Sequence, residues 1–174
     1  YLEAVRRELP EGAEVLDLGC GAGEPMAGYF IRQGFAVTGV DGSRAMIATC
    51  RERFPAMTWI EADMRGLDLG RRFDAVIAWD SFFHLNPADQ RAVFPVFARH
   101  ALPGALLLFT SGPDQGEATG VMEGVAFEHH SLSPGEYREL LEEHGFAVLT
   151  HLVEDPRCGG HTVWLARARK GLAG

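Results

Sequence analysis

A glycine-rich segment near the N-terminus constrains the fold more than any other part of the sequence. Residues 14–18 (EVLDL) form a short apolar run typical of a buried strand, and residues 25–33 have the pattern of a helix. The connection between them carries Gly19, Gly21 and Gly23. Glycine lets a backbone turn tightly and approach a ligand without a clash at Cβ. The segment therefore predicts a strand, a tight turn and a helix, and the turn either holds a ligand or only closes the connection.

The same alternation of apolar runs and helix-like segments continues to the end of the chain. The expected strands are 36–40, 57–60, 73–79, 105–110, 146–153 and 161–168, and the expected helices are 2–9, 43–53, 87–101 and 133–144. Pro95 lies inside the third of these helices and predicts a kink or a break. Strands that alternate with helices imply parallel βαβ units, and the last two strands read as a hairpin. The predicted fold is a doubly wound α/β sheet whose ligand lies at the carboxyl ends of the strands.

Composition narrows the partners. The chain has 174 residues, with 24 acidic and 16 basic side chains and a formal net charge of -8. This charge argues against bulk electrostatic binding to nucleic acid or to anionic membranes. Cys20, Cys50 and Cys158 are odd in number and widely spaced, which fits neither a disulfide framework nor a zinc motif. A reducing cytoplasm is the expected location, and a small molecule is the expected partner.

The residues after the glycine turn favour a ligand that is not a diphosphate. The dinucleotide fingerprint requires Gly or Ala at the sixth position of the motif, and Glu24 occupies it. A carboxylate at the start of the helix would repel a pyrophosphate, and Pro25 removes an amide donor. The Gly-Lys-Ser/Thr sequence of a phosphate-binding loop is absent.

Acidic residues follow the other early strands. Asp41 lies 18 residues beyond the last glycine of the turn, where it is placed to accept hydrogen bonds from ribose hydroxyls or, alternatively, to cap the helix beside Ser43. Asp63 is placed to accept from an adenine amino group while Met64 packs on the ring, unless it is a plain loop residue. Together with Asp17, these acids fall at strand ends on one rim of the sheet.

This arrangement resembles the class I S-adenosylmethionine-dependent methyltransferases. The resemblance rests on VLDLGCGAGEP, VTGVDGS, EADM and FDAVIAWDSFFHL, followed in order by LPGALLLF, SLSPGEYRELLEEHGF and WLARA. It implies a Rossmann-like seven-stranded sheet in the order 3-2-1-4-5-7-6, with the seventh strand antiparallel. It also implies one methyltransferase domain over residues 1–174. The family carries helices before the first strand, and only residues 1–10 of that segment are expected here.

The resemblance further implies the cofactor S-adenosyl-L-methionine, with S-adenosyl-L-homocysteine as its product. The methionine part of the cofactor is expected to contact Gly19, Cys20, Gly21 and Gly23, with Trp79, Asp80 and Ser81 nearby and Asp17 at its ammonium group. The ribose is expected to contact Asp41, and the adenine is expected to contact Asp63 and Met64. Further implied contacts are Gly42, Ser43 and Met46.

The sulfonium group of this cofactor already activates the methyl group, so the protein mainly positions the reactants and excludes water. If a base takes part, His84 is the first candidate, and Asp80 orients it or a substrate amine. Packing and capping are the alternative roles for both residues. His129 and His130 are expected as exposed loop histidines in a long stretch that is a plausible lid.

Other residues near the site have plainer expected roles. His161 and Cys158 are expected to be structural. Phe82, Phe83 and Phe127 either wall an apolar substrate pocket or belong to the core.

Missing motifs narrow the acceptor. No Asp/Asn-Pro-Pro-Tyr/Phe sequence follows the fourth strand, which opposes N-methylation of DNA adenine or of amides. No Pro-Cys nucleophile occurs, which opposes C5 methylation of cytosine. Thr110-Ser111-Gly112 stands where metal-dependent catechol enzymes carry Asp-Asn, so no metal is expected. The predicted function is methyl transfer to a small molecule by a monomer or homodimer. The alternatives are a non-catalytic cofactor-binding regulatory module and a nicotinamide-dependent oxidoreductase.

Overall fold

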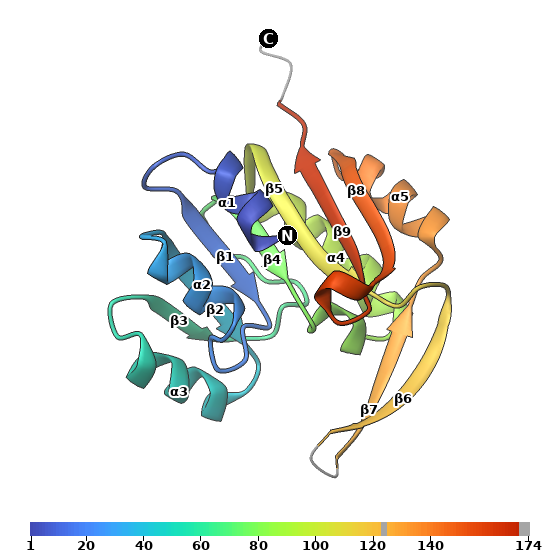
Figure 1. The fold of residues 1–174 in the computed structure, drawn as a ribbon, viewed down its shortest axis with the longest axis horizontal. Coiled ribbons are helices and arrows are strands. Elements are labelled where there is room, and N and C mark those ends of the chain that lie inside the picture. Colours follow the sequence, from blue (N-terminus) through green and yellow to red (C-terminus); the bar gives the residue numbers. More distant parts are fainter. Residues whose placement is uncertain (123–124, 171–174) are drawn as a thin grey trace.

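Seven strands form the central sheet of the computed structural model, which describes residues 1–122 and 125–170, without the side chains of residues 120–127 (Figure 1). The order is β3-β2-β1-β4-β5-β9-β8. Strands β1 to β5 are parallel, and β9 is antiparallel to both β5 and β8. The bounds are β1 Glu14–Leu18, β2 Ala36–Asp41, β3 Thr58–Glu61, β4 Phe73–Ala78, β5 Ala101–Ser111, β8 Phe146–Asp155 and β9 His161–Ala168. The expected sixth and seventh strands are β8 and β9, because the numbering also includes β6 and β7, which lie outside this sheet. The predicted doubly wound sheet, its order and its antiparallel strand are therefore confirmed.

Helices cover both faces of this sheet (Figure 1). One face carries α1 (Leu2–Glu8), α2 (Met26–Arg32) and α3 (Arg44–Arg53), and the other carries α4 (Pro87–His100) and α5 (Pro134–Glu143). Successive side chains of a strand point to opposite faces. Accordingly Leu107 and Phe109 pack with the α4–α5 layer, whereas Leu106 and Leu108 pack with the α1–α3 layer.

Helix α4 runs unbroken through Pro95, so of the predicted kink or break the break is wrong and the kink stays a prediction. Pro95 is exposed, whereas its neighbours Phe94, Val96 and Phe97 are buried in the core. An internal proline costs a helix about 3 kcal/mol, while each large apolar side chain contributes about 1.5–3 kcal/mol on burial. Burial of three such residues therefore outweighs the cost of the proline.

The expected long loop after β5 contains a second, two-stranded sheet. Strands β6 (Gly116–Met122) and β7 (Val125–Ser131) form an antiparallel hairpin that extends away from the main sheet (Figure 1). Its base is fixed where Gln90 Nε2 donates to the His130 carbonyl at 2.8 Å and Gly112 N donates to Ser131 Oγ at 2.6 Å. His129 and His130 are part-buried strand residues, so the expectation of exposed loop histidines is wrong.

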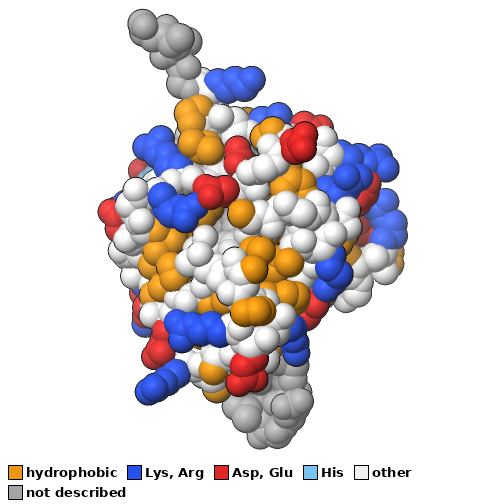
Figure 2. Space-filling model, turned by 90° about the vertical axis from the view of Figure 1, so that its left-hand side faces the viewer, with side chains coloured by type: hydrophobic (Ala, Val, Ile, Leu, Met, Phe, Trp, Pro, Cys, Tyr) orange, Lys and Arg blue, Asp and Glu red, His pale blue; other side chains and the backbone are white. Residues whose placement is uncertain are grey.

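No helix among residues 1–122 and 125–170 is long and apolar enough to cross a membrane. On the side of the molecule formed by β3 and α3, Lys/Arg and Asp/Glu side chains are interspersed (Figure 2). This face therefore carries no extended surface of a single charge.

Candidate active site

The turn between β1 and α2 is held in place by the two neighbouring strands. Gly19 N donates to the Val40 carbonyl at 2.7 Å, and Ser81 Oγ donates to the Leu18 carbonyl at 2.7 Å. Gly19 has a φ of +73°, and a Cβ built on it would lie 2.2 Å from Ser81 Cβ. Only glycine fits there, because any side chain would be strained and would collide with Ser81. Ser81 thus supports the turn, a role that its position after β4 makes possible.

Asp41, at the end of β2, shapes the same turn. Its Oδ2 accepts from Gly21 N and its Oδ1 accepts from Ser43 N, each at 2.8 Å. Ser43 itself caps α3 by accepting from Met46 N. The carboxylate remains only partly buried and lines a cleft. Asp41 therefore combines a structural role with a position in which its remaining lone pairs can accept hydrogen bonds from hydroxyl groups.

A cleft of about 470 Å³ opens between the ends of β2 and β3, and we call it the β2–β3 cleft. Its lining residues are Gly19, Val40, Asp41, Gly42, Glu61, Ala62, Asp63, Met64, Arg65 and Leu85. Arg65 is the lone Lys or Arg among these described residues, and it pairs with Asp63 and with Asp89. The cleft therefore offers carboxylate acceptors and a cation that is already neutralised. This chemistry suits a nucleoside with positive charge better than a nucleotide phosphate.

Asp17 lies beneath the turn with one carboxylate oxygen unpaired. Its side chain is buried, the Ala27 amide hydrogen-bonds to it, and Oδ2 has no partner among the described residues. Burial raises the pKa of Asp17 to about 7, and repulsion from Asp41 adds to the rise, against the Ala27 hydrogen bond. A cationic donor beside Oδ2 would remove this penalty. The expected ammonium group of S-adenosylmethionine fits this requirement.

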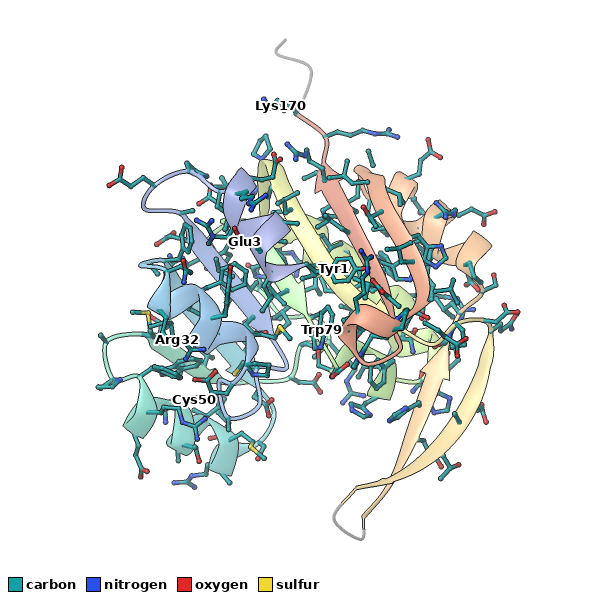
Figure 3. The ribbon with its side chains drawn as sticks, in the orientation of Figure 1. Tyr1, Glu3, Arg32, Cys50, Trp79 and Lys170 are labelled. Atoms are coloured by element: carbon teal, nitrogen blue, oxygen red, sulfur yellow. The ribbon has the colours of Figure 1, made fainter. Side chains whose placement is uncertain are left out.

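Several other expected cofactor contacts do not line the cleft. Cys20 is buried and packs in the α1–α3 layer, and burial raises the pKa of its thiol. Met46 is 44% exposed on α3. Trp79 is half-buried near the β8–β9 turn, with its ring centroid 6.4 Å from Tyr1 and 5.3 Å from His161 (Figure 3). The ligand contacts of Cys20, Gly21, Gly23, Ser43, Met46, Trp79, Asp80 and Ser81 stay predictions.

A second cavity of about 490 Å³ lies at the same edge of the sheet, under the β6–β7 hairpin, and we call it the hairpin cavity. It is lined by Phe83, Ser111, Gly112, Pro113, Asp114, Gln115, Gly116, Glu117, Ala118, His129, Ser131, Glu154, Gly159, Gly160, His161 and Thr162. Of the three aromatic residues expected in a substrate pocket, Phe83 lines it and Phe82 is fully buried in the core. The side chain of Phe127 lies outside the described part of the chain.

Asp80 pairs with His161 at the border of the hairpin cavity. His161 Nε2 lies 3.0 Å from the Asp80 carboxylate, and Asp80 N donates to Thr110 Oγ1 at 2.9 Å. Asp80 has a φ of 49°, a strained backbone conformation that these contacts hold in place. One signal for this pair was available in the sequence. The last strand is antiparallel, so its first residue lies at the carboxyl ends of the parallel strands.

His84 follows β4 in a short 3-10 helix, η1 (Phe82–His84), and its side chain is exposed. Its ring centroid lies 4.8 Å from that of Phe83 and 5.0 Å from that of His129. His84 thus contacts two residues that line the hairpin cavity without lining it itself, and its role as a base stays a prediction. Within the described residues, no group of three or more His, Cys, Asp or Glu is placed to hold a metal ion.

Comparison with known proteins identifies relatives of this chain. A family model described as a methyltransferase domain matches residues 15–104, more than half of the chain. A dTDP-3-amino-3,4,6-trideoxy-alpha-D-glucopyranose N,N-dimethyltransferase of Streptomyces venezuelae is 32% identical over 108 residues, covering 61% of this chain and 45% of that protein. A trans-aconitate 2-methyltransferase of Azoarcus sp. (strain BH72) is 34% identical over 103 residues, covering 59% and 40%. The chain therefore spans less than half the length of these two relatives.

Solved structures agree on the fold. The S-adenosylmethionine-bound amino pentose methyltransferase CalS10 of Micromonospora echinaspora matches with a TM-score of 0.76 at 21% identity, covering 95% of this chain and 87% of that chain. The segment matched by the family model contains the glycine turn, Asp41, Asp63 and the end of β4, whereas the hairpin and β9 lie beyond it. The chain belongs to the methyltransferase domain family and has its Rossmann-like fold.

Proposed function

We propose that this chain transfers a methyl group from S-adenosylmethionine to a small molecule held in the hairpin cavity. The observation that carries the proposal is the buried, unpaired Oδ2 of Asp17 beside an acidic cleft without a free Lys or Arg among its described lining residues. When bound, S-adenosylmethionine supplies an electrophilic methyl group on a sulfonium cation. The residues of this chain bind it, orient it and exclude water.

Asp17 and the residues of the cleft each have a proposed role that follows from their chemistry. The Asp17 carboxylate accepts from the ammonium group and becomes ionised when it does so. Asp41 accepts from ribose hydroxyls through the lone pairs that its two backbone donors leave free. Asp63 and Met64 flank the adenine, with Asp63 fixed by Arg65.

The hairpin cavity favours an enzyme over a non-catalytic binding module. A module that only binds the cofactor needs the β2–β3 cleft alone, whereas this chain has a second cavity of the size of a small-molecule site at the same edge. The relatives differ in the acceptor for which they are named. One is named for an amino sugar, which is an amine, and the other for trans-aconitate, which is an acid.

A nicotinamide dinucleotide fits the cleft less well, for a reason that differs from the expected one. Glu24 pairs with Arg32 at 2.6 Å, so its carboxylate is largely neutralised and repels a diphosphate less than its position indicates. Pro25 still provides no amide donor at the start of α2. The carboxylates of Asp41 and Glu61, which form no ion pair with a described residue, add the stronger obstacle to a diphosphate.

Calorimetric titration with S-adenosylhomocysteine tests the proposal. The chain should bind it with a Kd in the micromolar range, and Asp41→Ala should weaken binding at least tenfold by removing the ribose acceptor and two hydrogen bonds of the turn. Asp68→Asn, a change at an exposed aspartate away from the cleft, is the control and should bind as the parent chain does. Binding of oxidised nicotinamide dinucleotide in place of S-adenosylhomocysteine would contradict the proposal.

A further inference from the structure

The lining of the hairpin cavity has one sign of charge. Asp114, Glu117 and Glu154 stand on its walls, and no Lys or Arg is among its described lining residues. Carboxylates concentrate cations and oppose phosphate or carboxylate groups at the same place. The two histidines of the lining, His129 and His161, differ in what their ring nitrogens contact.

His161 has both ring nitrogens engaged. Nδ1 contacts the Cys158 carbonyl and Nε2 contacts Asp80, so both partners are hydrogen-bond acceptors. Each ring nitrogen is therefore occupied by a protein partner. Neither nitrogen of His161 is free to take a substrate proton. His161 fixes the wall of the cavity and positions Asp80.

His129 has the opposite arrangement. Its ring is part-buried on β7, with ring centroids 4.6 Å from Phe83 and 5.0 Å from His84, and no described residue hydrogen-bonds to its ring nitrogens. A tilted contact with Phe83 and an edge-to-face contact with His84 hold the ring in place. A lone pair on a fixed ring at the cavity wall is the geometry of a proton acceptor.

We propose that the hairpin cavity takes an amine that carries no phosphate or carboxylate group, and that the His129 imidazole removes the proton of this amine. The inference rests on the proposed function and specifies its acceptor. It differs from the nucleotide-linked amino sugar for which one relative is named, because a diphosphate would meet three carboxylates.

The charged surroundings of His129 agree with this role. Burial lowers its pKa below the usual 6.5, repulsion from His84 and His130 lowers it further, and Asp80 acts in the opposite direction. The other titratable groups of the cavity are His161, Asp114, Glu117 and Glu154, and His130 contacts Glu117 and Glu128. These surroundings therefore favour the neutral form of His129, which can accept a proton.

The proton and electron changes balance. An ammonium group enters, its N–H bond breaks, the electron pair stays on nitrogen, and the proton binds to the His129 nitrogen. The free amine then forms an N–C bond to the methyl group, while the S–C bond of the donor breaks and its electron pair stays on sulfur. The imidazolium returns its proton to water.

The acceptor class is tested by comparing primary and secondary amines, among them glucosamine and tyramine, with matched compounds. The anionic compounds are glucosamine 6-phosphate and trans-aconitate, and the compounds with hydroxyl groups but no amine are glucose and tyrosol. Products are detected by transfer of a tritiated methyl group. Amines should yield at least tenfold more product than the matched compounds. Equal or lower yield from amines would overturn the acceptor class, whereas failure to bind S-adenosylhomocysteine would overturn the proposed function first.

The role of His129 is tested by His129→Gln, with His130→Gln as the matched control on the same strand. His129→Gln should lower kcat about 100-fold or more with little change in KM and in S-adenosylhomocysteine binding. It should also remove the acid limb of the pH profile, which lies below pH 6.5 in the parent chain. His130→Gln should stay within threefold of the parent. Imidazole NMR titration should show a His129 resonance that titrates below pH 6.5 and is absent in His129→Gln. An unchanged kcat or pH profile in His129→Gln would overturn this role.

Discussion

The β2–β3 cleft and the hairpin cavity lie at the same edge of the sheet but are built differently. The cleft is formed at the ends of neighbouring parallel strands, and backbone amides of Gly19 and Gly21 tie it to Val40 and Asp41. The cavity is lined by Phe83 and by residues from segments 111–118, 129–131 and 154–162, which lie far apart in the sequence. Tilted and edge-to-face ring contacts hold its hairpin against η1. We infer that the backbone determines the cleft, whereas side chains determine the cavity.

The largest effect on ligand affinity and stability is expected at Gly19, where the backbone of the cleft leaves no room for a side chain. Gly19→Ala adds a Cβ 2.2 Å from Ser81 Cβ at a φ of +73°. We expect S-adenosylhomocysteine affinity to fall at least 100-fold in calorimetry, and the free energy of unfolding to fall by about 2–3 kcal/mol. Gly135→Ala, with its nearest atom 3.9 Å away, is the control and should leave both values almost unchanged. Binding within threefold in Gly19→Ala would show that side chains, not the backbone, determine the cleft.

The second largest effect is expected from the protonation of Asp17, which changes the free energy of unfolding with pH. Asp17 has a pKa of about 7 in the folded chain against an ordinary value of 3.8. Between these pH values the folded chain keeps a proton that the unfolded chain has lost. The contribution of Asp17 to the free energy of unfolding therefore falls as pH rises from about 4 to about 7, by roughly 4 kcal/mol in total.

Urea unfolding of Asp17→Asn checks this sign. The variant should gain stability relative to the parent chain as pH rises from 5 to 8, because Asn cannot ionise. Asp68→Asn, at an exposed position, should track the parent at both pH values. Parallel stability curves for Asp17→Asn and the parent would mean that Asp17 does not keep its proton in the folded chain.

The smallest effect on ligand affinity in the cleft is expected from a substitution in the hairpin cavity. His161→Gln breaks the 3.0 Å contact with Asp80, both partners of which are partly exposed. Such pairs contribute about 0–1 kcal/mol, so thermal unfolding should change little. S-adenosylhomocysteine affinity should stay within threefold, because His161 does not line the cleft. A tenfold loss of affinity would show that the two regions are one coupled site.

The sequence predicted the cleft better than the cavity, and the reason is physical. Asp41 and Asp63 follow short strands whose carboxyl ends meet at one edge, so local patterns place them. The glycine turn is also marked by a local pattern, although its partners, Val40 in β2 and Ser81 after β4, are distant in the sequence. The order of the strands, by contrast, came from the family resemblance.

The cavity depends on pairings that no local pattern reveals. Asp80 and His161 are 81 residues apart and meet because β9 enters the sheet in the antiparallel direction. The hairpin was missed because glycines, among them Gly116 and Gly120, interrupt the alternation that marks a strand. His129 was consequently expected in a loop, and the sequence offered His84 as the candidate base, a role that stays a prediction.

A structure of this chain with S-adenosylhomocysteine tests the central claim most directly. The account predicts the ligand in the β2–β3 cleft, with its ammonium nitrogen at Asp17 Oδ2, directly or through one water, and its ribose hydroxyls on Asp41. The hairpin cavity should remain open for the acceptor. A ligand seated in the hairpin cavity, or one that leaves Asp17 Oδ2 unpaired, would contradict the account.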